Sequence, residues 1–440
     1  MRLWRSRRIT IALALLFLIT IIYLYIKPEK PATHTLFEPL ELLWWPKVMS
    51  WNYDETRTCG FAKCRFTNKR ENLQQASGVL FYGSNMNPHD FPLPRMSLHL
   101  WALLHEESPR NVPYVPHEEF LQHFNLTSTF SRHSDFPLTI QYLPHAEDLG
   151  NFEYYLSFAR KQRASFDHTL APVLFLQSDC DTMTGREDYV LELMKHIRVD
   201  SYGACLHNRD LPESLQHDYL NNLYSAPLLR FISSYKFMIA IENGACDDYI
   251  TEKYWRPLMV GTIPIYFGSP SIRDWEPNNS SAIYISDFAN AAALAEHLKQ
   301  VGDNATAYNT YRQKGKNQKL VVSNKRLQNA LFSRRYSIGE HKSIFQQFEC
   351  FVCQNFAKHN LHSPPKSADK THYSCPYPPA HAPLQNAKQR PKNADDWRSM
   401  MAMGRCQAQL LDQLFRANRN YTQQDYDARL TNMISQGLCD

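Results

Sequence analysis

The sequence predicts an α/β fold, because from residue 171 onward apolar runs typical of buried strands alternate with stretches of helical periodicity. This alternation is typical of parallel sheets, whose faces are covered by helices. Neither GxGxxG nor GxxxxGK[ST] occurs, which argues against a dinucleotide-binding enzyme and against a P-loop ATPase. Strands are expected at residues 173–177, 201–204, 237–241, 263–267 and 282–285, and helices at residues 186–198, 226–234, 250–259 and 289–301.

One segment, residues 235–270, joins two of these strands through a polar loop and a helix. The first strand ends at Glu242 and Asn243. Ligands of parallel sheets bind outside the carboxyl ends of the strands, so both side chains should lie near a bound ligand. Glu252 and Lys253 fall in the first turn of the helix, where free backbone amides and a lysine can both face an anion. The segment therefore predicts a site for a phosphorylated ligand.

Two adjacent carboxylates, Glu106 and Glu107, follow the apolar run 98–104 in the sequence HEESP. Pro109 bars continuation of a strand, so the run should deliver both carboxylates to a strand end. A carboxylate in that position suits a general base. The alternative is a pair of solvated loop acids, and the spacing alone favours that alternative. A further strand is expected at residues 79–82.

The N-terminus predicts a transmembrane signal-anchor. Four arginines in the first eight residues precede an uncharged apolar run of 18 residues, 9–26, which reaches the length needed to span a bilayer. A cleaved signal peptide is disfavoured, because the run is long and ends in bulky residues without a small-residue cleavage site. Basic residues before the span place residues 1–8 in the cytosol and the rest of the chain in the lumen of the secretory pathway.

Sequons and cysteines agree with a lumenal location. The chain has ten cysteines, which an oxidising compartment could pair. The formal net charge of +5 includes the four N-terminal arginines, so nucleic acid is not an expected partner. Candidate N-glycosylation sites are Asn125, Asn278, Asn279, Asn304 and Asn420.

Composition divides the chain into six expected segments. Residues 27–50 are rich in proline and lack periodicity, which is typical of a stem, and proline, lysine and asparagine dominate a linker at 361–395. The segments are a cytosolic tail (1–8), a transmembrane signal-anchor (9–26), a stem (27–50), an N-terminal domain (51–170), a C-terminal domain (171–358), and a linker with a cysteine-containing tail (359–440).

The cysteines suggest structural disulfides. Cys59 and Cys64 flank a short loop and could pair with each other or anchor the N-terminal domain to a distant segment. A C-x-x-C motif ends at Cys353. In the lumen, without a second such motif or a histidine pair at zinc spacing, disulfides are favoured over a zinc site. Cys180 and Cys205 end neighbouring expected strands and are a further candidate pair.

Four motifs together resemble the α1,3-fucosyltransferases, glycosyltransferase family ten. The segment IENGACDDYITEKYWRPLMVGTIPIYFGSP looks like the family signature, and HEESP, FNLTSTFSRHSD and SDCDTMTGREDY followed by VDSYGAC match in the expected order over residues 80–353. WRPL, YFGSP, Cys246 and the long tail resemble the branch of human fucosyltransferases ten and eleven more than the Lewis-type branch. The resemblance implies a GT-B architecture, in which an N-terminal Rossmann-like domain presents the acceptor and a C-terminal one holds GDP-fucose across a cleft.

The implied reaction is an inverting transfer of L-fucose from GDP-β-L-fucose to a glycan, in α1,3 linkage to GlcNAc. Transfer to Ser or Thr of folded disulfide-rich modules is an alternative. A catalytically dead lumenal glycan-binding or scaffold protein is another. The expected location is the Golgi membrane, with the endoplasmic reticulum as the alternative.

The resemblance also implies a role for particular residues. Glu107 corresponds to the base that takes the proton of the acceptor hydroxyl. Arg186 and Lys253 correspond to cations that bind the diphosphate. The other expected donor contacts are Asn243, Tyr249 and Glu252, with Glu242 as a weaker candidate.

Two further implications concern metal and disulfides. The sequence Asp179-Cys-Asp181 looks like a metal-binding DxD motif, but the family uses basic side chains in place of a cation, so no metal and no obligatory cofactor are expected. The family pattern also implies that the N-terminal cysteine pair is tied to the C-terminal pair. The implied partners are Cys59 and Cys64 with Cys350 and Cys353.

Overall fold

The computed structural model describes residues 39–46, 53–150, 153–180, 182, 184–216, 222–312, 320–336, 343–358, 366–376 and 392–439. The expected signal-anchor, residues 9–26, lies outside these ranges. Among the described residues, no helix is both long and apolar enough to cross a membrane. The chain divides after Pro39, and the elements that carry the site belong to the unit Leu40–Asp440.

The first sheet of this unit has six strands: β1 (Leu40–Trp44), β2 (Asp54–Cys59), β3 (Ala62–Thr67), β4 (Gly78–Tyr82), β5 (Leu100–His105) and β6 (Leu126–Thr129). Their order is β2-β3-β1-β4-β5-β6. The edge strand β2 runs antiparallel to β3, and the other neighbouring strands are parallel. β5 is buried along its whole length, which explains its uninterrupted apolar run. The strands expected at residues 79–82 and 98–104 are confirmed, although the second begins at Leu100.

The second sheet has five strands: β7 (Val173–Leu176), β8 (Val199–Tyr202), β9 (Phe237–Ile241), β10 (Ile263–Phe267) and β11 (Ile283–Tyr284). Their order is β11-β10-β9-β7-β8, and every neighbouring pair is parallel. All five expected strands are present, with the second shifted by two residues toward the N-terminus.

The α-helices are α2 (Glu118–Leu121), α3 (Phe158–Phe166), α4 (Arg186–Met194), α5 (Glu213–Gln216), α6 (Ala226–Ser233), α7 (Glu252–Met259), α8 (Ala291–Asp303), α9 (Ala305–Tyr311), α10 (Lys325–Ser333), α11 (Ile344–Lys358), α12 (Lys392–Ala417) and α13 (Gln423–Ser435). Short 3-10 turns lie at Arg70–Asn72, Gly83–Asn85, Ala146–Gly150, Ile272–Asp274, Ile285–Asp287 and Lys370–Tyr373.

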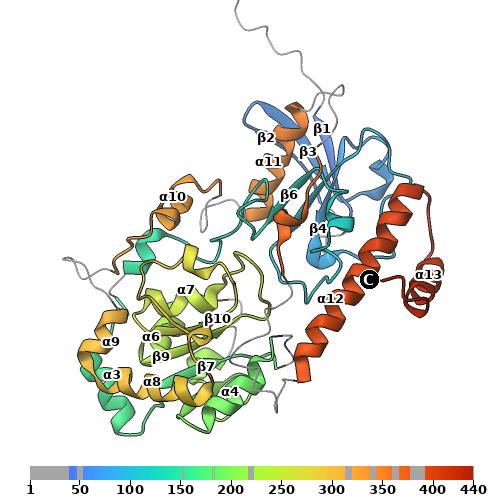
Figure 1. Ribbon diagram of the computed structural model, residues 1–440. Coiled ribbons are helices and arrows are strands. Elements are labelled where there is room, and N and C mark those ends of the chain that lie inside the picture. The colour runs from blue at the N-terminus through green and yellow to red at the C-terminus, as the bar shows by residue number, and fades with distance from the viewer. Residues whose placement is uncertain are drawn as a thin grey trace, which may run out of the picture. The chain divides into compact units, whose positions relative to one another are not determined.

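Helices cover both faces of the five-stranded sheet (Figure 1). Alternate residues of β9 separate into two cores because successive side chains of a strand point to opposite faces. Phe237 and Ile239 pack with residues of α4 and α8. Met238 and Ala240 pack with residues of α6 and α7. The expected α/β fold with a parallel sheet is therefore confirmed.

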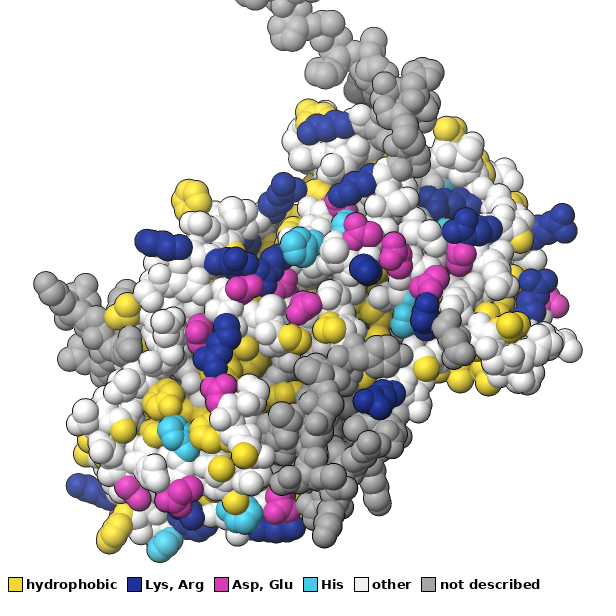
Figure 2. Space-filling model, viewed as in Figure 1, with side chains coloured by type: hydrophobic (Ala, Val, Ile, Leu, Met, Phe, Trp, Pro, Cys, Tyr) yellow, Lys and Arg dark blue, Asp and Glu magenta, His cyan; other side chains and the backbone are white. Residues whose placement is uncertain are grey.

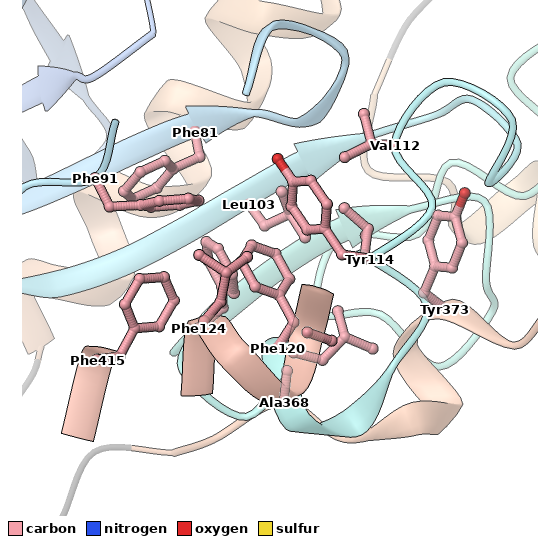
Figure 3. Packing of buried hydrophobic residues seen from close by; sticks show 14 of the residues in the cluster. Phe81, Phe91, Leu103, Val112, Tyr114, Phe120, Phe124, Ala368, Tyr373 and Phe415 are labelled. Atoms are coloured by element: carbon pink, nitrogen blue, oxygen red, sulfur yellow. The ribbon is translucent and has the colours of Figure 1, made fainter. Parts of the chain in front are cut away.

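Helices from the end of the chain cover both faces of the six-stranded sheet. Leu80 and Leu104 face a core that contains apolar residues of α11. Phe81 and Trp101 face the opposite core, which contains apolar residues of α12. Figure 3 shows Phe415, from α12, in one packed cluster with aromatic side chains of the N-terminal half. Segments more than 300 residues apart in sequence thus form this domain together.

Three expected segment boundaries differ from the structure. The stem was expected to reach residue 50, but β1 lies inside it and pairs with both β3 and β4. Its five residues stand between two prolines and are too short to show a periodicity. The C-terminal domain was expected to include α11, which instead packs on the N-terminal sheet. The linker and tail were expected to stand apart, but residues 366–376 and 392–439 join the N-terminal core.

All ten cysteines lie in the described part of the chain and are paired. Two bridges join the β2–β3 hairpin to α11, as the family resemblance implied, and the third candidate pair is also confirmed. Two more bridges were not predicted, one between the loop after β9 and the tail and one within the tail. The five bridges are Cys59–Cys350, Cys64–Cys353, Cys180–Cys205, Cys246–Cys375 and Cys406–Cys439.

Basic and acidic side chains are interspersed on the face drawn in Figure 2. Neither sign forms a continuous stripe along that face. The mixture of charges on this face agrees with the small net charge of the chain.

Replacing Phe415 by alanine tests whether the tail is part of the core. The Phe415 ring centroid lies 4.9 Å from that of Phe91 and 5.3 Å from that of Trp101. We expect Phe415→Ala to lower the free energy of unfolding by about 3–5 kcal/mol, because it leaves a cavity among these rings. Urea unfolding followed by tryptophan fluorescence measures the change. The control is Phe332→Ala, whose side chain is 94% exposed; equal midpoints for the two variants would contradict the packing described.

Candidate active site

The ends of two strands meet at the candidate site. β5 ends two residues before Glu107, and β9 ends two residues before Asn243. The hydroxyl of Tyr249, from the loop after β9, lies 3.3 Å from Oε2 of Glu107 and 3.0 Å from Oδ1 of Asn243, and it can donate to one of them at a time. The structure therefore brings together three predicted site residues that come from different sheets.

The carboxyl group of Glu107 titrates at a higher pH than an ordinary glutamate. Burial raises its pKa, the positive charge of Lys253 opposes the rise, and the negative charge of Glu252 adds to it. A carboxylate whose pKa lies closer to neutrality accepts a proton more readily than a solvated one. The environment of Glu107 therefore suits a general base.

The adjacent Glu106 belongs to the N-terminal sheet. Tyr82 donates a hydrogen bond of 2.6 Å to Oε1 of Glu106. Burial raises the pKa of Glu106 to about 6. Of the two neighbouring carboxylates, Glu107 is the one that contacts Tyr249. The local geometry thus distinguishes two acids that the sequence could not tell apart.

Glu242 is fully buried and holds the start of α7. Its Oε1 accepts a hydrogen bond of 2.7 Å from the backbone N–H of Thr251, and its Oε2 accepts one of 2.7 Å from the Thr251 hydroxyl. Burial raises the pKa of Glu242, and the positive charge of Lys253 lowers it. With both carboxylate oxygens engaged, Glu242 orients the helix that carries the neighbouring charged residues.

Three charged side chains of α7 lie close together. Nζ of Lys253 is 3.2 Å from Oε1 of Glu252 and 3.5 Å from Oε2 of Glu242. Nη2 of Arg256 is 3.6 Å from Oε1 of Glu252. Burial raises the pKa of Glu252, but Lys253 and Arg256 outweigh that effect and hold the pKa at about 2. Glu252 is therefore ionised at neutral pH, unlike a carboxylate buried alone.

Arg186 begins α4 behind Gly185, whose φ of +62° makes the tight turn into the helix. The guanidinium donates to the backbone oxygens of Ile241, at 3.3 Å, and Asp179, at 2.8 Å. Its Nε has no hydrogen-bond partner among the described residues. Burial lowers the pKa of Arg186, and the charge of Glu242 opposes that effect. Arg186 thus lies at the carboxyl ends of β7 and β9, where a ligand of this sheet would bind.

The loop after Asn243 comes very close to the HEESP segment. A Cβ atom at Gly244 would lie 2.7 Å from Cβ of Ser108 and 3.4 Å from Cη2 of Trp397. Only glycine fits this contact without displacing a neighbour. A second contact joins the residues after HEESP to the loop after β7, because Arg110 forms an ion pair with Asp179.

The tail contributes residues to the site that the sequence did not predict. The hydroxyl of Tyr373 donates a hydrogen bond of 2.5 Å to the backbone oxygen of Glu107. The bridge Cys246–Cys375 joins the loop after Asn243 to the same part of the tail. The only sequence signal was that four of the ten cysteines had no assigned partner, and spacing does not reveal which of them pair.

A cavity of about 510 Å³ lies beside Tyr373. Its wall is mixed polar and apolar and comes mainly from residues 131–133, 247–248 and 370–376, with Pro116 and Ser271. Because Tyr373 both lines the cavity and contacts Glu107, the cavity is one side chain away from that residue. The lining includes Arg132, His133, Asp247, Asp248, Lys370 and Thr371.

No group of three or more His, Cys, Asp or Glu side chains that could hold a metal ion exists among the described residues. Asp181, the second acid of the DxD-like sequence, lies outside them. The first acid, Asp179, faces Arg110.

The five candidate sequons differ in accessibility. Asn125 is buried, and its Nδ2, the atom that would carry a glycan, donates to the backbone oxygen of Lys366 at 2.9 Å. Asn278 is also buried, and its Nδ2 donates to the backbone oxygen of Val321 at 2.8 Å. Both positions therefore disagree with the expectation of glycosylation in the folded protein. The remaining asparagines are exposed: Asn279, Asn304 and Asn420.

Comparisons with known proteins show the family of this chain. The family model "Fucosyltransferase, N-terminal" matches residues 38–142, and "Glycosyltransferase family 10 (fucosyltransferase) C-term" matches residues 168–368. The chain is 52% identical to "Alpha-(1,3)-fucosyltransferase B" of Drosophila melanogaster, over 91% of this chain and 90% of that protein. It is 38% identical to human "GDP-fucose protein O-fucosyltransferase 3", over 88% of this chain and 81% of that protein.

Solved structures are more distant. An α1,3-fucosyltransferase crystallised with GDP-fucose matches 75% of this chain and 93% of its own, at 14% identity and a TM-score of 0.39. The sequence relatives and the two family models together cover most of the chain. The chain therefore belongs to glycosyltransferase family 10, the fucosyltransferases.

Proposed function

We propose that this protein transfers L-fucose from GDP-β-L-fucose to a hydroxyl group and inverts the anomeric centre. The observation that carries the proposal is the contact between Tyr249, Glu107 and Asn243, which brings together the ends of one strand from each sheet. Family membership supports the same reaction. We further propose that the two sheets are the two halves of a GT-B enzyme and that the donor binds to the C-terminal half.

The proposed step is one direct displacement. Glu107 takes the proton of the acceptor hydroxyl as its oxygen forms a bond to C1 of fucose, and the bond between C1 and the diphosphate oxygen breaks. GDP leaves with the electron pair of that bond. Lys253 and Arg186 supply positive charge for the diphosphate, and ionised Glu252 opposes the positive charge that grows on the sugar. Two side-chain cations in this role support a reaction without a metal ion.

The acceptor we propose is GlcNAc in a glycan, joined through an α1,3 linkage. The name of the Drosophila relative, 52% identical to this chain, supports this acceptor. A hydroxyl of Ser or Thr in a folded protein module is the second candidate. It is supported by relatives at 36–39% identity that are named GDP-fucose protein O-fucosyltransferase 3.

Release of GDP from GDP-fucose tests the reaction and separates the acceptors. The panel contains an N-glycan core, N-acetyllactosamine and small disulfide-rich protein domains, each with and without excess chelator. We expect transfer to a GlcNAc-containing glycan that chelator does not reduce. Fucose found only on protein hydroxyls would favour the second candidate. No transfer to any acceptor would favour a dead glycan-binding or scaffold protein.

Glu107→Gln tests the base. We expect kcat to fall by about 10²- to 10⁴-fold while GDP affinity stays within about twofold, because the amide keeps the shape but accepts no proton. Steady-state kinetics and calorimetric GDP titration measure the two quantities. A variant with wild-type turnover would remove Glu107 from the proposed step.

The pH profile gives an independent control for the same prediction. The base works when deprotonated, so activity is present above its pKa and is lost as pH falls through that value. Burial raises this pKa above the ordinary carboxyl value of 4.5, so the acid limb of kcat/KM should lie above pH 4.5.

Lys253→Ala tests the donor site, in contrast to Glu107→Gln, and it should weaken GDP binding. Unchanged GDP affinity in that variant would remove Lys253 from the donor site.

We propose a single-pass type II protein of the Golgi membrane, anchored by residues 9–26, with the endoplasmic reticulum as the alternative. The apolar N-terminal run supports the anchor. Five disulfides support an oxidising lumenal compartment.

Glycan mapping tests the lumenal location. In chain made through a secretory pathway, we expect glycans at the exposed residues Asn279, Asn304 and Asn420, and none at Asn125 or Asn278, whose amides are buried and bonded. Peptide mass spectrometry before and after glycosidase treatment measures the occupancy of each. A chain without any N-glycan would contradict the location, and a glycan on Asn125 would contradict the packing around it.

A further inference from the structure

Two tyrosines hold Glu107 from opposite ends of the residue. Tyr249 reaches the carboxylate, at 3.3 Å from Oε2. Tyr373 reaches the backbone, where its hydroxyl donates to the carbonyl oxygen at 2.5 Å. One tyrosine comes from the loop after β9 and the other from the tail. Both are therefore far from Glu107 along the sequence.

The segments that carry the two tyrosines are joined to each other. Cys246, three residues before Tyr249, forms a disulfide with Cys375, two residues after Tyr373. Between these positions, the backbone N–H of Asp247 donates to the backbone oxygen of Ser374 at 2.9 Å. The Ser374 hydroxyl donates to Oδ2 of Asp247 at 2.7 Å. One disulfide and two hydrogen bonds therefore join the two segments.

Aromatic packing fixes both tyrosine rings. The ring centroid of Phe130 lies 5.1 Å from that of Tyr249 and 4.6 Å from that of Tyr373. On its other side, the Tyr373 ring stacks on His105 with centroids 5.5 Å apart. Tyr373 is fully buried, and Figure 3 shows it at the edge of the core cluster. Packing between two rings restricts the orientation of the Tyr373 side chain.

We propose that Tyr373, held by the bridge Cys246–Cys375, is a positioning residue for Glu107 and makes the tail a working part of the active site. The inference rests on the proposed function. Its reason is geometric: a carboxylate displaced by about 1 Å from a reacting hydroxyl loses on the order of 10²-fold in rate. Tyr373 prevents such a displacement by fixing the backbone of the residue that carries the carboxylate.

A simpler explanation is that this bridge only fastens the tail. The tail is already held, however, by the apolar residues of α12 in the N-terminal core. The bridge Cys406–Cys439 joins two parts of the tail to each other. The contact at Tyr373 differs because it is directed at the residue that takes the proton in the proposed step, which fastening alone does not require.

Tyr373→Phe separates positioning from folding. We expect kcat to fall by about tenfold to 10²-fold, with donor KM, GDP affinity and unfolding midpoint close to those of the wild type, because the ring and its packing remain. The control is Tyr426→Phe, which removes another buried tail hydroxyl, one without a hydrogen-bond partner among the described residues. That control should keep wild-type kcat. A wild-type kcat in Tyr373→Phe would overturn the inference.

Two further measurements use the same assay. The double variant Cys246→Ser/Cys375→Ser should lose kcat to a similar degree, whereas Cys406→Ser/Cys439→Ser should keep it. Adding Tyr373→Phe to Glu107→Gln should not lower the residual rate further, since a residue that acts through Glu107 has nothing left to position. An additional loss of about tenfold on the Glu107→Gln background would overturn the inference.

The assay also separates this inference from the proposed function. A wild-type chain that transfers no fucose to any acceptor overturns the proposed function and the inference that depends on it. An active wild type with a fully active Tyr373→Phe variant overturns the inference alone.

Discussion

The six-stranded sheet depends on the burial of its two apolar faces by helices that come last in the chain. β4 and β5 carry apolar side chains on both faces, and α11 and α12 cover one face each. Burial of a large aromatic side chain stabilises a core by about 1.5–3 kcal/mol, so this packing contributes much of what holds the N-terminal half together. Because β5 also delivers Glu107, the same packing sets where that residue lies.

The candidate site holds two buried carboxyl groups whose pKa values are shifted in opposite directions. Burial raises the pKa of Glu107, which has no cation in hydrogen-bond contact among the described residues. Glu252 is held at about 2 by Lys253 and Arg256 despite its burial. Two acids with pKa values pushed apart can take different roles at one pH, one accepting a proton and the other remaining charged. The difference comes from where α7 places its cations.

Strand positions were predictable because strands buried on both faces read as continuous apolar runs, as in residues 237–241 and 263–267. Short β1 escaped prediction because five residues between prolines show no period. The apolar side chains of α12 do not reveal which surface they pack against, because that surface is far away in the sequence. For the same reason its packing on β4 and β5 was not foreseen.

The residues of the candidate site likewise fall into those that could be predicted from the sequence and those that could not. The expected strand ends predicted Glu242 and Asn243 as site residues. The family resemblance implied Glu107, Arg186 and Tyr249. Spacing could not show that Tyr249 meets Glu107, because 142 residues separate them. Spacing also could not show that the tail reaches the site, because Tyr373 lies in a proline-rich stretch without hydrophobic periodicity. Such long-range contacts depend on how two sheets and a tail pack, which local propensity does not encode.

The order of elements along the chain also matters for synthesis. A ribosome releases β4 and β5 well before it releases Phe415, so the nascent N-terminal sheet emerges with one apolar face lacking its partner helix. The other face waits for α11, and the bridges from the β2–β3 hairpin wait for Cys350 and Cys353. Domains of most proteins fold in order from the N-terminus. Here the first sheet to be made is the last to be completed, and a chain cut short before α12 would keep Glu107 on an unfinished domain.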